Sequence, residues 1–242
     1  MRRRCIEEWD GTLTMQIRME VFPFVAASFA TGLLVLAGLR WRRKSWQKAT
    51  CYSAIATIIL CGYFLFFFRD PDRTPPADTG LIVSGADGTI ASITDIYEST
   101  YLKTNCVRVS IFLSLFDVHV NRAPLSGQAT FLGYFPGKRF FTFQDKSSDF
   151  NQHNKILIAG DRTQCLVNQI VGPVCRRVVY WLDHENPQRV GRGERIGMMK
   201  FGSRLDMLFP KSEVHVVVEL GQHVRAGETV VAVTDYHDKE ME

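Results

Sequence analysis

The sequence lacks the motifs with which many enzymes hold nucleotides and metal ions. It contains no G-x-G-x-x-G segment, no Walker-type segment and no alternation of strand and helix patterns typical of a nucleotide-binding sheet. None of its six cysteines forms a C-x-x-C pair, and their spacing matches neither a disulfide framework nor a zinc site. We therefore expect no nucleotide cofactor, no bound metal, and free thiols in a reducing compartment.

Beyond residue 48 the sequence also lacks any excess of positive charge. Residues 1–48 contain nine Lys or Arg against four Asp or Glu, whereas the remainder contains twenty against twenty-one. A nucleic-acid-binding protein would carry its basic surface on the folded domain, so we expect no nucleic acid partner. A basic N-terminal region instead favours contact with an anionic membrane surface.

Two long runs without a charged residue lie in and after this basic region. Val21–Leu39 is nineteen residues long and Cys51–Phe68 is eighteen, close to the roughly 20 apolar residues of a membrane-spanning helix. The loop between them, Arg40–Lys48, is basic and contains two tryptophans, as is common at a membrane interface. We predict a hydrophobic helical hairpin that spans the bilayer or lies partly embedded in it. A pair of buried helices in a soluble protein is the alternative.

A proline-rich segment separates this hairpin from the rest of the chain. Arg69–Pro76 contains three prolines within six residues and cannot continue a helix. We predict a membrane-associating region at 1–70 and a second domain at 71–242.

The second domain has the pattern of short strands between turns. Runs rich in β-branched or aromatic residues predict strands at Leu81–Val83, Val107–Leu113, Gln128–Leu132, Ile156–Ile158 and Val214–Leu220. Gln169–Leu182 is interpreted as a strand pair broken at Gly172-Pro173, and further turns are expected at Gly221 and Gly227. The predicted fold class is mainly β (α+β): a β-rich catalytic domain with an N-terminal hydrophobic helical hairpin.

Several motifs follow one another in a fixed order from about residue 68 to the C-terminus. They are FRDPDR (68–73), SGADG (84–88), IFLSLFDVHVNRAPLSG (111–127), YFPGK (134–138), DKSSDFN (145–151), GERIG (193–197), FGSRLD (201–206) and GQHVRAGE (221–228). Each is weak alone, but their order and spacing resemble the short bacterial-type phosphatidylserine decarboxylases. The resemblance implies a lyase that converts phosphatidylserine to phosphatidylethanolamine at a bacterial cell membrane. We expect the cytoplasmic face, but the charges leave the orientation open: a cytoplasmic Arg40–Lys48 loop would send the second domain outside if both helices span, whereas Arg2, Arg3 and Arg4 favour the opposite orientation.

The resemblance also implies that the chain is a proenzyme that cuts itself between Gly202 and Ser203. Decarboxylation of an amino acid leaves a carbanion, which needs an electron sink that no unmodified side chain supplies. The family's sink is a covalent pyruvoyl group, here expected to form from Ser203. The expected partners are phosphatidylserine, a large chain 1–202 bound to a small chain 203–242, and a second copy in a possible homo-oligomer.

Self-cleavage needs a flexible residue before the serine and a base for its hydroxyl. Glycine suits the bend that brings a serine hydroxyl onto the preceding carbonyl, and Gly202 stands there. Histidine is the usual base near neutral pH, and a carboxylate can orient it. The family's motifs map these catalytic roles onto His119 and Asp87. Longer relatives carry a second histidine where this chain has Arg122, so the self-cleavage base stays open between His119 and another group.

Basic residues near these motifs are candidates for the lipid phosphate. Arg122, Lys146 and Arg204 are the substrate-binding residues that we expect, and ordinary surface charge is the alternative for each. Arg139–Phe143 is either a loop that dips into the bilayer or a strand with core aromatics.

Three other functions compete with this interpretation. The same chemistry could act on another seryl phospholipid, such as an ether lipid. Ser203, His119 and Asp87 could instead form a membrane-anchored serine hydrolase that stays uncut. The chain could also be a β-rich binding module, since the turn at Gly221–Glu228 resembles lipoyl carriers, although it lacks the lysine that such carriers modify.

Overall fold

The computed structural model describes residues 15–138, 151–172 and 178–234. The chain divides into two compact units, Met1–Asp72 and Arg73–Glu242.

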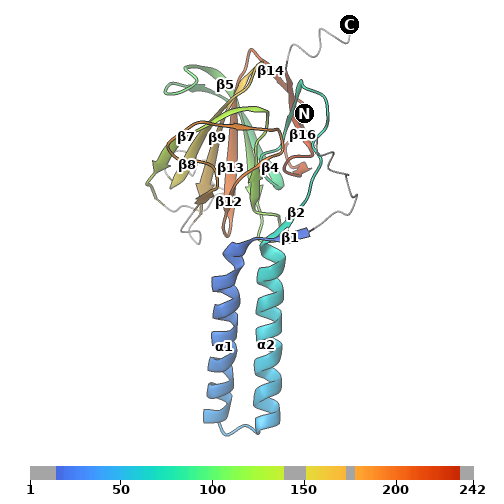
Figure 1. Cartoon of the computed structure of the whole chain (residues 1–242), viewed down its shortest axis with the longest axis vertical. Helices are drawn as coiled ribbons and strands as arrows, with labels where there is room; N and C mark the ends of the chain where they lie inside the picture. Colours follow the sequence, from blue (N-terminus) through green and yellow to red (C-terminus); the bar gives the residue numbers. More distant parts are fainter. Residues whose placement is uncertain (1–14, 139–150, 173–177, 235–242) are drawn as a thin grey trace, which may run out of the picture. The chain divides into compact units, whose positions relative to one another are not determined.

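The N-terminal unit is a helical hairpin closed by a short strand pair (Figure 1). Its elements are β1 (Met15–Ile17), the 3-10 helix η1 (Met19–Val21), α1 (Phe22–Trp41), α2 (Trp46–Phe67) and β2 (Arg69–Pro71). β1 and β2 pair in antiparallel fashion. Both helices are long and apolar enough to cross a membrane, and few of their residues are buried. The predicted hairpin of two hydrophobic helices is therefore confirmed.

Small residues allow α1 and α2 to pack closely. The Ser53 hydroxyl of α2 donates a hydrogen bond of 2.6 Å to the carbonyl oxygen of Gly32 on α1. A Cβ atom on Gly32 would lie 2.0 Å from Oγ1 of Thr57, so a larger residue at this crossing would force the Thr57 side chain to move. Small and hydroxyl-bearing residues are common where helices associate in membranes.

The second unit is built on an antiparallel sheet of eight strands in the order β11-β7-β8-β9-β13-β5-β4-β15 (Figure 1). Their bounds are β4 (Gly88–Glu98), β5 (Thr104–Leu113), β7 (Gly127–Phe135), β8 (His153–Ala159), β9 (Gln164–Val171), β11 (Gln188–Val190), β13 (Ser203–Pro210) and β15 (His223–Val224). Two smaller sheets complete the unit, β10-β12-β6 and β14-β16-β3. Their strands are β3 (Leu81–Val83), β6 (Val120–Arg122), β10 (Val178–Tyr180), β12 (Arg195–Met199), β14 (Val214–Val216) and β16 (Val230–Thr234).

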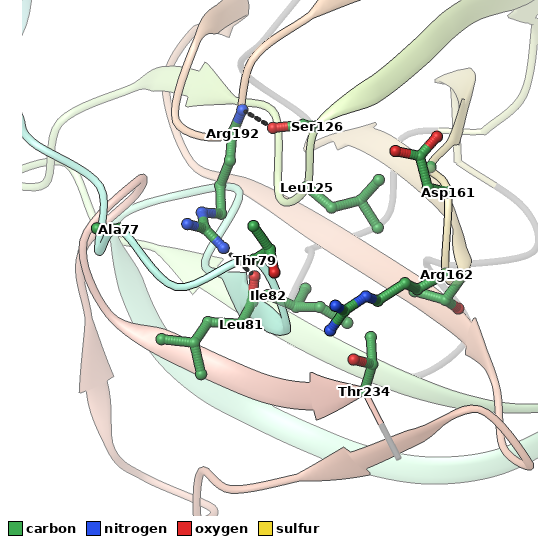
Figure 2. A pocket seen from close by; sticks show the side chains of 12 residues that line it. Ala77, Thr79, Leu81, Ile82, Leu125, Ser126, Asp161, Arg162, Arg192 and Thr234 are labelled. Carbon is green, nitrogen blue, oxygen red and sulfur yellow. Dashed lines mark hydrogen bonds between the residues drawn. The ribbon is translucent and has the colours of Figure 1, made fainter. Parts of the chain in front are cut away.

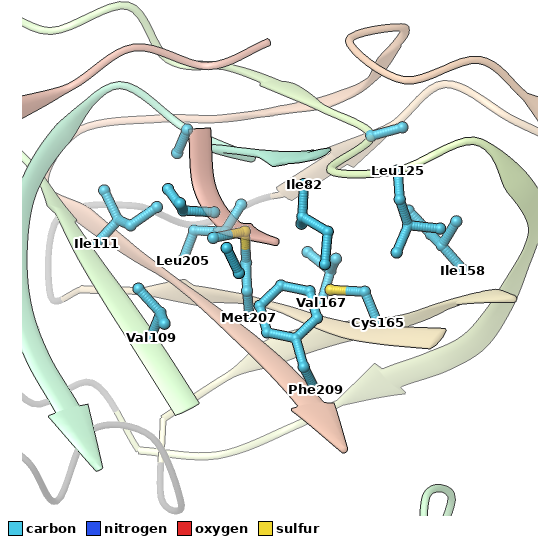
Figure 3. Close-up of a cluster of buried hydrophobic side chains, with 14 of the residues drawn as sticks. Ile82, Val109, Ile111, Leu125, Ile158, Cys165, Val167, Leu205, Met207 and Phe209 are labelled. Carbon is cyan, nitrogen blue, oxygen red and sulfur yellow. The ribbon is translucent and has the colours of Figure 1, made fainter. Parts of the chain in front are cut away.

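The main core lies against one face of the large sheet (Figure 3). Leu205, Met207 and Phe209 of β13 point into it together with Val109 and Ile111 of β5. Side chains alternate along a strand, so Ser203 lies on the same core-facing side of β13 as Leu205, Met207 and Phe209. The intervening residues of β13 face the other side of the sheet. β13 is an interior strand, paired with β5 on one side and β9 on the other.

The mainly β fold class is confirmed, and most predicted strands lie inside observed ones. Two expectations differ in detail. The strand predicted at Val214–Leu220 ends at Val216 (β14), and the chain beyond it is not a strand until β15. Gln169–Leu182 contributes to two strands, β9 and β10, but they belong to different sheets and do not pair with each other. The break at Gly172 marks the point where the chain leaves the large sheet. The turns expected at Gly221 and Gly227 are present.

Candidate active site

Ser203 is the first residue of the interior strand β13. Its backbone is in register with Leu113 of β5 and Val171 of β9. The residue is fully buried, and its hydroxyl oxygen has no hydrogen-bond partner within residues 15–138, 151–172 and 178–234. A buried hydroxyl without a partner costs about 1–3 kcal/mol and calls for an explanation in a native fold.

The turn before Ser203 has an unusual backbone. Phe201 and Gly202 both have positive φ, at 57° and 68°. The left-handed region costs a non-glycine residue roughly 1–2 kcal/mol, so Phe201 stores strain one residue from the predicted cut. A Cβ atom on Gly202 would meet no other atom within 4 Å. The position therefore favours glycine because of its positive φ, and not because a larger side chain would clash with its neighbours.

His119 lies just before β6 and is fully buried. Its Nδ1 is 3.0 Å from the carbonyl oxygen of Asp117. A carbonyl can only accept, so Nδ1 carries the hydrogen, and in the neutral ring Nε2 is the basic nitrogen. The His119 carbonyl accepts a 3.1 Å hydrogen bond from the backbone N–H of Met199, at the end of β12. The predicted histidine is thus tied to the strand that leads into Ser203.

Asp87 is buried beside a different set of groups. Nη2 of Arg73 donates to its Oδ2 at 2.7 Å, Nη1 contacts Oδ1, and the N–H of Ala226 donates to Oδ1 at 2.8 Å. Arg73 Nη1 also donates to the Ala226 carbonyl at 2.7 Å. Among the described residues the Asp87 carboxylate makes no hydrogen bond to His119. Its contacts join the start of this unit to the turn before β16.

Asp117, which the sequence analysis did not single out, lies two residues before His119. Its Oδ2 accepts a 2.8 Å hydrogen bond from the Ser114 N–H, and its Oδ1 lies 3.1 Å from Nε2 of His223. Burial raises the pKa of this carboxyl, but hydrogen bonds from Ser114 and the contact with His223 outweigh burial, so the pKa lies below its usual value. Asp117 therefore fixes the loop whose carbonyl holds His119.

A chain of buried amides lies on the core side of the same region. Gln169 donates a 2.8 Å hydrogen bond to Oδ1 of Asn121, and Asn154 donates to Gln169 at 3.4 Å. Asn121 follows His119 by two residues, and its amide nitrogen has no partner among the described residues. Gln169 is in register with Leu205, two residues after Ser203. No motif in the sequence marked this network.

The three predicted phosphate-binding residues have different surroundings. Arg122 is buried, and its Nη1 donates to the Gly193 carbonyl at 2.9 Å. Arg204 is also buried and forms an ion pair with Asp206, with Nε at 2.7 Å from Oδ1. Both members of that pair project from the face of β13 opposite to Ser203. Lys146 and Arg139–Phe143 lie outside the described residues.

The described residues offer no group of three His, Cys, Asp or Glu side chains that could bind a metal ion. Nucleophilic chemistry uses a serine hydroxyl and a histidine base. The described residues supply a buried serine hydroxyl after a strained turn and a buried histidine whose tautomer is set by the main chain.

Sequence comparison shows which known proteins the chain is similar to. The family model described as phosphatidylserine decarboxylase matches residues 60–232. A phosphatidylserine decarboxylase proenzyme of Syntrophus aciditrophicus is 39% identical over 214 residues, which are 88% of this chain and 95% of that protein. The proenzyme of Carboxydothermus hydrogenoformans is 41% identical over 177 residues, covering 73% and 82%. That of Gluconacetobacter diazotrophicus is 38% identical over 214 residues, covering 87% and 91%.

Proposed function

Because the chain belongs to the phosphatidylserine decarboxylase family and is a carboxy-lyase, we propose that it converts phosphatidylserine to phosphatidylethanolamine after cutting itself between Gly202 and Ser203. Its relatives are named proenzymes, which fits a chain that must be processed before it acts. The observation that carries the proposal is the buried Ser203 hydroxyl, which has no partner among the described residues and follows a glycine with positive φ.

Self-cleavage and pyruvoyl formation use atoms of this chain and one water molecule. The Ser203 oxygen attacks the carbonyl carbon of Gly202, and the amide bond becomes an ester with a free amino group on residue 203. Loss of the proton on Cα of residue 203 expels the Gly202 carboxylate and leaves dehydroalanine. Water then replaces the nitrogen, which departs as ammonia, and a ketone remains at the new N-terminus. Strain at Phe201 supports the first step, since that step rearranges the backbone beside it.

His119 is the proposed base for the serine proton. Its Nε2 is the atom able to accept a proton, because Nδ1 donates to the Asp117 carbonyl. A histidine so held can accept and return a proton at Nε2 without changing its orientation. We propose that Asp87 also belongs to the catalytic site. It acts indirectly, because its contacts with Arg73 and Ala226 hold together the segments on which they lie.

The residues present suit a pyruvoyl group at position 203. When formed, the group supplies the electron sink that decarboxylation requires. The chain's own residues then hold residue 203 in place, because β13 stays paired with β5 and β9 of the large chain. Residue 203 is buried, so the bulk solvent does not contact it. His119 is the group that we propose returns a proton to the product carbon.

We further propose that α1 and α2 hold the enzyme at the membrane that contains its lipid substrate. Their length and apolar composition support this role. We propose that the enzyme acts at the cytoplasmic face of that membrane.

The direct test is a lipid assay with purified full-length protein in detergent micelles. Phosphatidylserine should yield phosphatidylethanolamine and carbon dioxide, and the Ser203→Ala variant should yield neither. A seryl ether lipid assayed in parallel tests the alternative substrate. Phospholipid ester hydrolysis by an uncut wild-type chain would instead support the serine hydrolase.

A further inference from the structure

A hydrogen bond between two buried amide side chains joins the strand that follows His119 to the sheet that contains Ser203. Gln169 lies on β9 of the eight-stranded sheet, and Asn121 lies on β6 of the sheet β10-β12-β6. Nε2 of Gln169 donates to Oδ1 of Asn121 at 2.8 Å, and both residues are fully buried. The proposed function uses neither of them.

Each amide lies one step along the chain from a candidate catalytic residue. Asn121 follows His119 by two residues. Gln169 is in register with Leu205, which follows Ser203 by two residues. Side chains two residues apart in an extended chain point to the same side and lie about 7 Å apart along it. The hydrogen bond therefore fixes the spacing of the two sheets within one such step of both the histidine and the serine.

The Gln169 amide is also held at its oxygen. Nδ2 of Asn154, the residue of β8 in register with Gln169, donates to Oε1 of Gln169 at 3.4 Å. Because this oxygen is occupied, the Gln169 nitrogen faces Asn121, which must then present its own oxygen. The three amides form a directed chain from the large sheet to β6, and no member turns over without breaking a bond.

The neighbouring strand β12 leaves room for this contact. Gly197 is the partner of Asn121 where β12 pairs with β6. A Cβ atom on Gly197 would lie 3.1 Å from Nε2 of Gln169 and 2.3 Å from the carbonyl oxygen of Val179. A side chain at position 197 would therefore push against the Gln169 amide that bonds to Asn121. This gives a physical reason for the second glycine of the GERIG motif.

The hydrogen bond is more selective for one arrangement than the packing around it. Ile196, Met199 and Leu205 contribute to the apolar core of this unit. Apolar contacts are non-directional and tolerate a small slide of one sheet over another, whereas a hydrogen bond requires both a distance and an angle. A slide that broke it would leave buried amides unpaired, which is unfavourable.

We propose that Gln169 is a positioning residue for self-cleavage, an inference that rests on the proposed function. Through Asn121 it holds His119 where Nε2 can take the proton of the Ser203 hydroxyl. Its own hydrogen bonds go to Asn121 and Asn154, so it acts through the backbone of β6 and not on the reacting atoms. Misplacing a reacting group by about 1 Å can slow a reaction about 100-fold, so a small slide of the sheets suffices.

The first test compares the rate of self-cleavage with Tm in full-length protein made by cell-free synthesis in detergent. Gln169→Met keeps the length of the side chain but removes the amide. It should cut roughly 10–100-fold more slowly than wild type and have a lower Tm. Adding Asn121→Leu removes the group left unpaired and should restore most of the Tm, since replacing both partners by apolar groups can be nearly neutral.

The double variant Gln169→Met, Asn121→Leu should nevertheless still cut slowly, because nothing then sets the spacing of the two sheets beside the site. Recovery of the cleavage rate together with Tm would overturn the proposal, since that is the result of a merely structural role.

Two controls make comparable changes elsewhere. Asn168→Leu replaces the buried amide next to Gln169 on β9, whose side chain faces the other side of the sheet. Thr234→Val removes a buried hydroxyl beside a cavity of about 260 Å³ (Figure 2). The β8–β9 turn lines that cavity, at the end of β9 opposite to Val171, the partner of Ser203. Both variants should cut at the wild-type rate. Slowing by either as large as that of Gln169→Met would contradict a specific role for Gln169.

A second measurement reads the position of His119 without cleavage. In Ser203→Ala protein, which is expected to stay uncut, the imidazole NMR signals are recorded with isotope-labelled histidine, and comparison with His119→Ala identifies the His119 signal. Gln169→Met should shift or split that signal, and Asn168→Leu should leave it unchanged. A His119 signal unaffected by Gln169→Met would overturn the proposal. An uncut wild type that shows the expected NMR change would support the positioning contact and count against the proposed function alone.

Discussion

The carbonyl oxygen of Asp117 lies 3.0 Å from Nδ1 of His119. This one contact sets the tautomer of the ring and leaves Nε2 as its basic atom. The Asp117 carboxylate meanwhile binds the Ser114 N–H and contacts His223, so the loop that holds the histidine is itself held. In a serine hydrolase a separate carboxylate orients the histidine. Here the main chain does so.

His119→Ala should block or slow self-cleavage. Loss of a general base typically costs roughly 10²–10⁴-fold in rate. Cell-free synthesis followed by gel analysis at successive times measures the fraction cut. His215→Ala is the control, since His215 is exposed on β14 and should have no effect. Wild-type processing of His119→Ala would remove this residue from the site.

Asp117 should make the fold sensitive to acid. Its pKa in the folded protein is below the usual 3.8, so it stabilises the fold above that pH and ceases to do so as the pH falls through its depressed value. Asp117→Asn should therefore lose less stability than wild type between about pH 5 and pH 3, measured as urea midpoints. His223→Ala should show part of that change. Identical pH profiles for wild type and Asp117→Asn would contradict the assignment.

Position 202 should tolerate substitution according to conformation and not size. Its φ is 68°, and the space around a Cβ atom there is open. Asn enters the left-handed region more readily than other residues, whereas a β-branched residue does so least. Gly202→Asn should therefore cut at near the wild-type rate and Gly202→Val roughly tenfold or more slowly. Equal rates for the two variants would show that this backbone conformation does not govern cleavage.

The buried pair of Arg204 and Asp206 should matter first for stability. Asp206→Leu leaves a buried guanidinium without this partner and should cost about 3–5 kcal/mol in unfolding free energy. Asp95→Ala, which breaks an exposed pair with Lys211, should cost about 1 kcal/mol or less. Arg204→Met with Asp206→Leu should recover much of the loss. A raised KM for phosphatidylserine in that stable double variant would support the predicted lipid contact, and an unchanged KM would count against it.

Local patterns predicted the secondary structure well because their causes are local. Uncharged runs of helical length became α1 and α2, and β-branched runs became strands of the large sheet and of the sheet β14-β16-β3. Which strands pair with one another was harder to predict from the sequence. Gln169–Leu182 has the pattern of two adjacent strands, but β9 and β10 joined different sheets, a choice made by distant partners.

The site shows the same division. Motifs brought Ser203, Gly202 and His119 to notice, but the partners of Asp87 could not be seen from the sequence, since Ala226 lies 139 residues away. For Arg204 a usable pattern existed. Strand alternation from Ser203 already places Arg204 and Asp206 together on the opposite face. The amide network of Asn121 and Gln169 had no such pattern, because it depends on contact between two sheets.

The central claim is that Ser203 is a precursor and not a lasting side chain. Intact mass spectrometry of the purified protein tests it most directly. We predict two chains, one ending at Gly202 and one beginning at residue 203 with a pyruvoyl group in place of serine, whereas Ser203→Ala should remain one chain. A single uncut wild-type chain of 27.5 kDa that decarboxylates phosphatidylserine would contradict the claim.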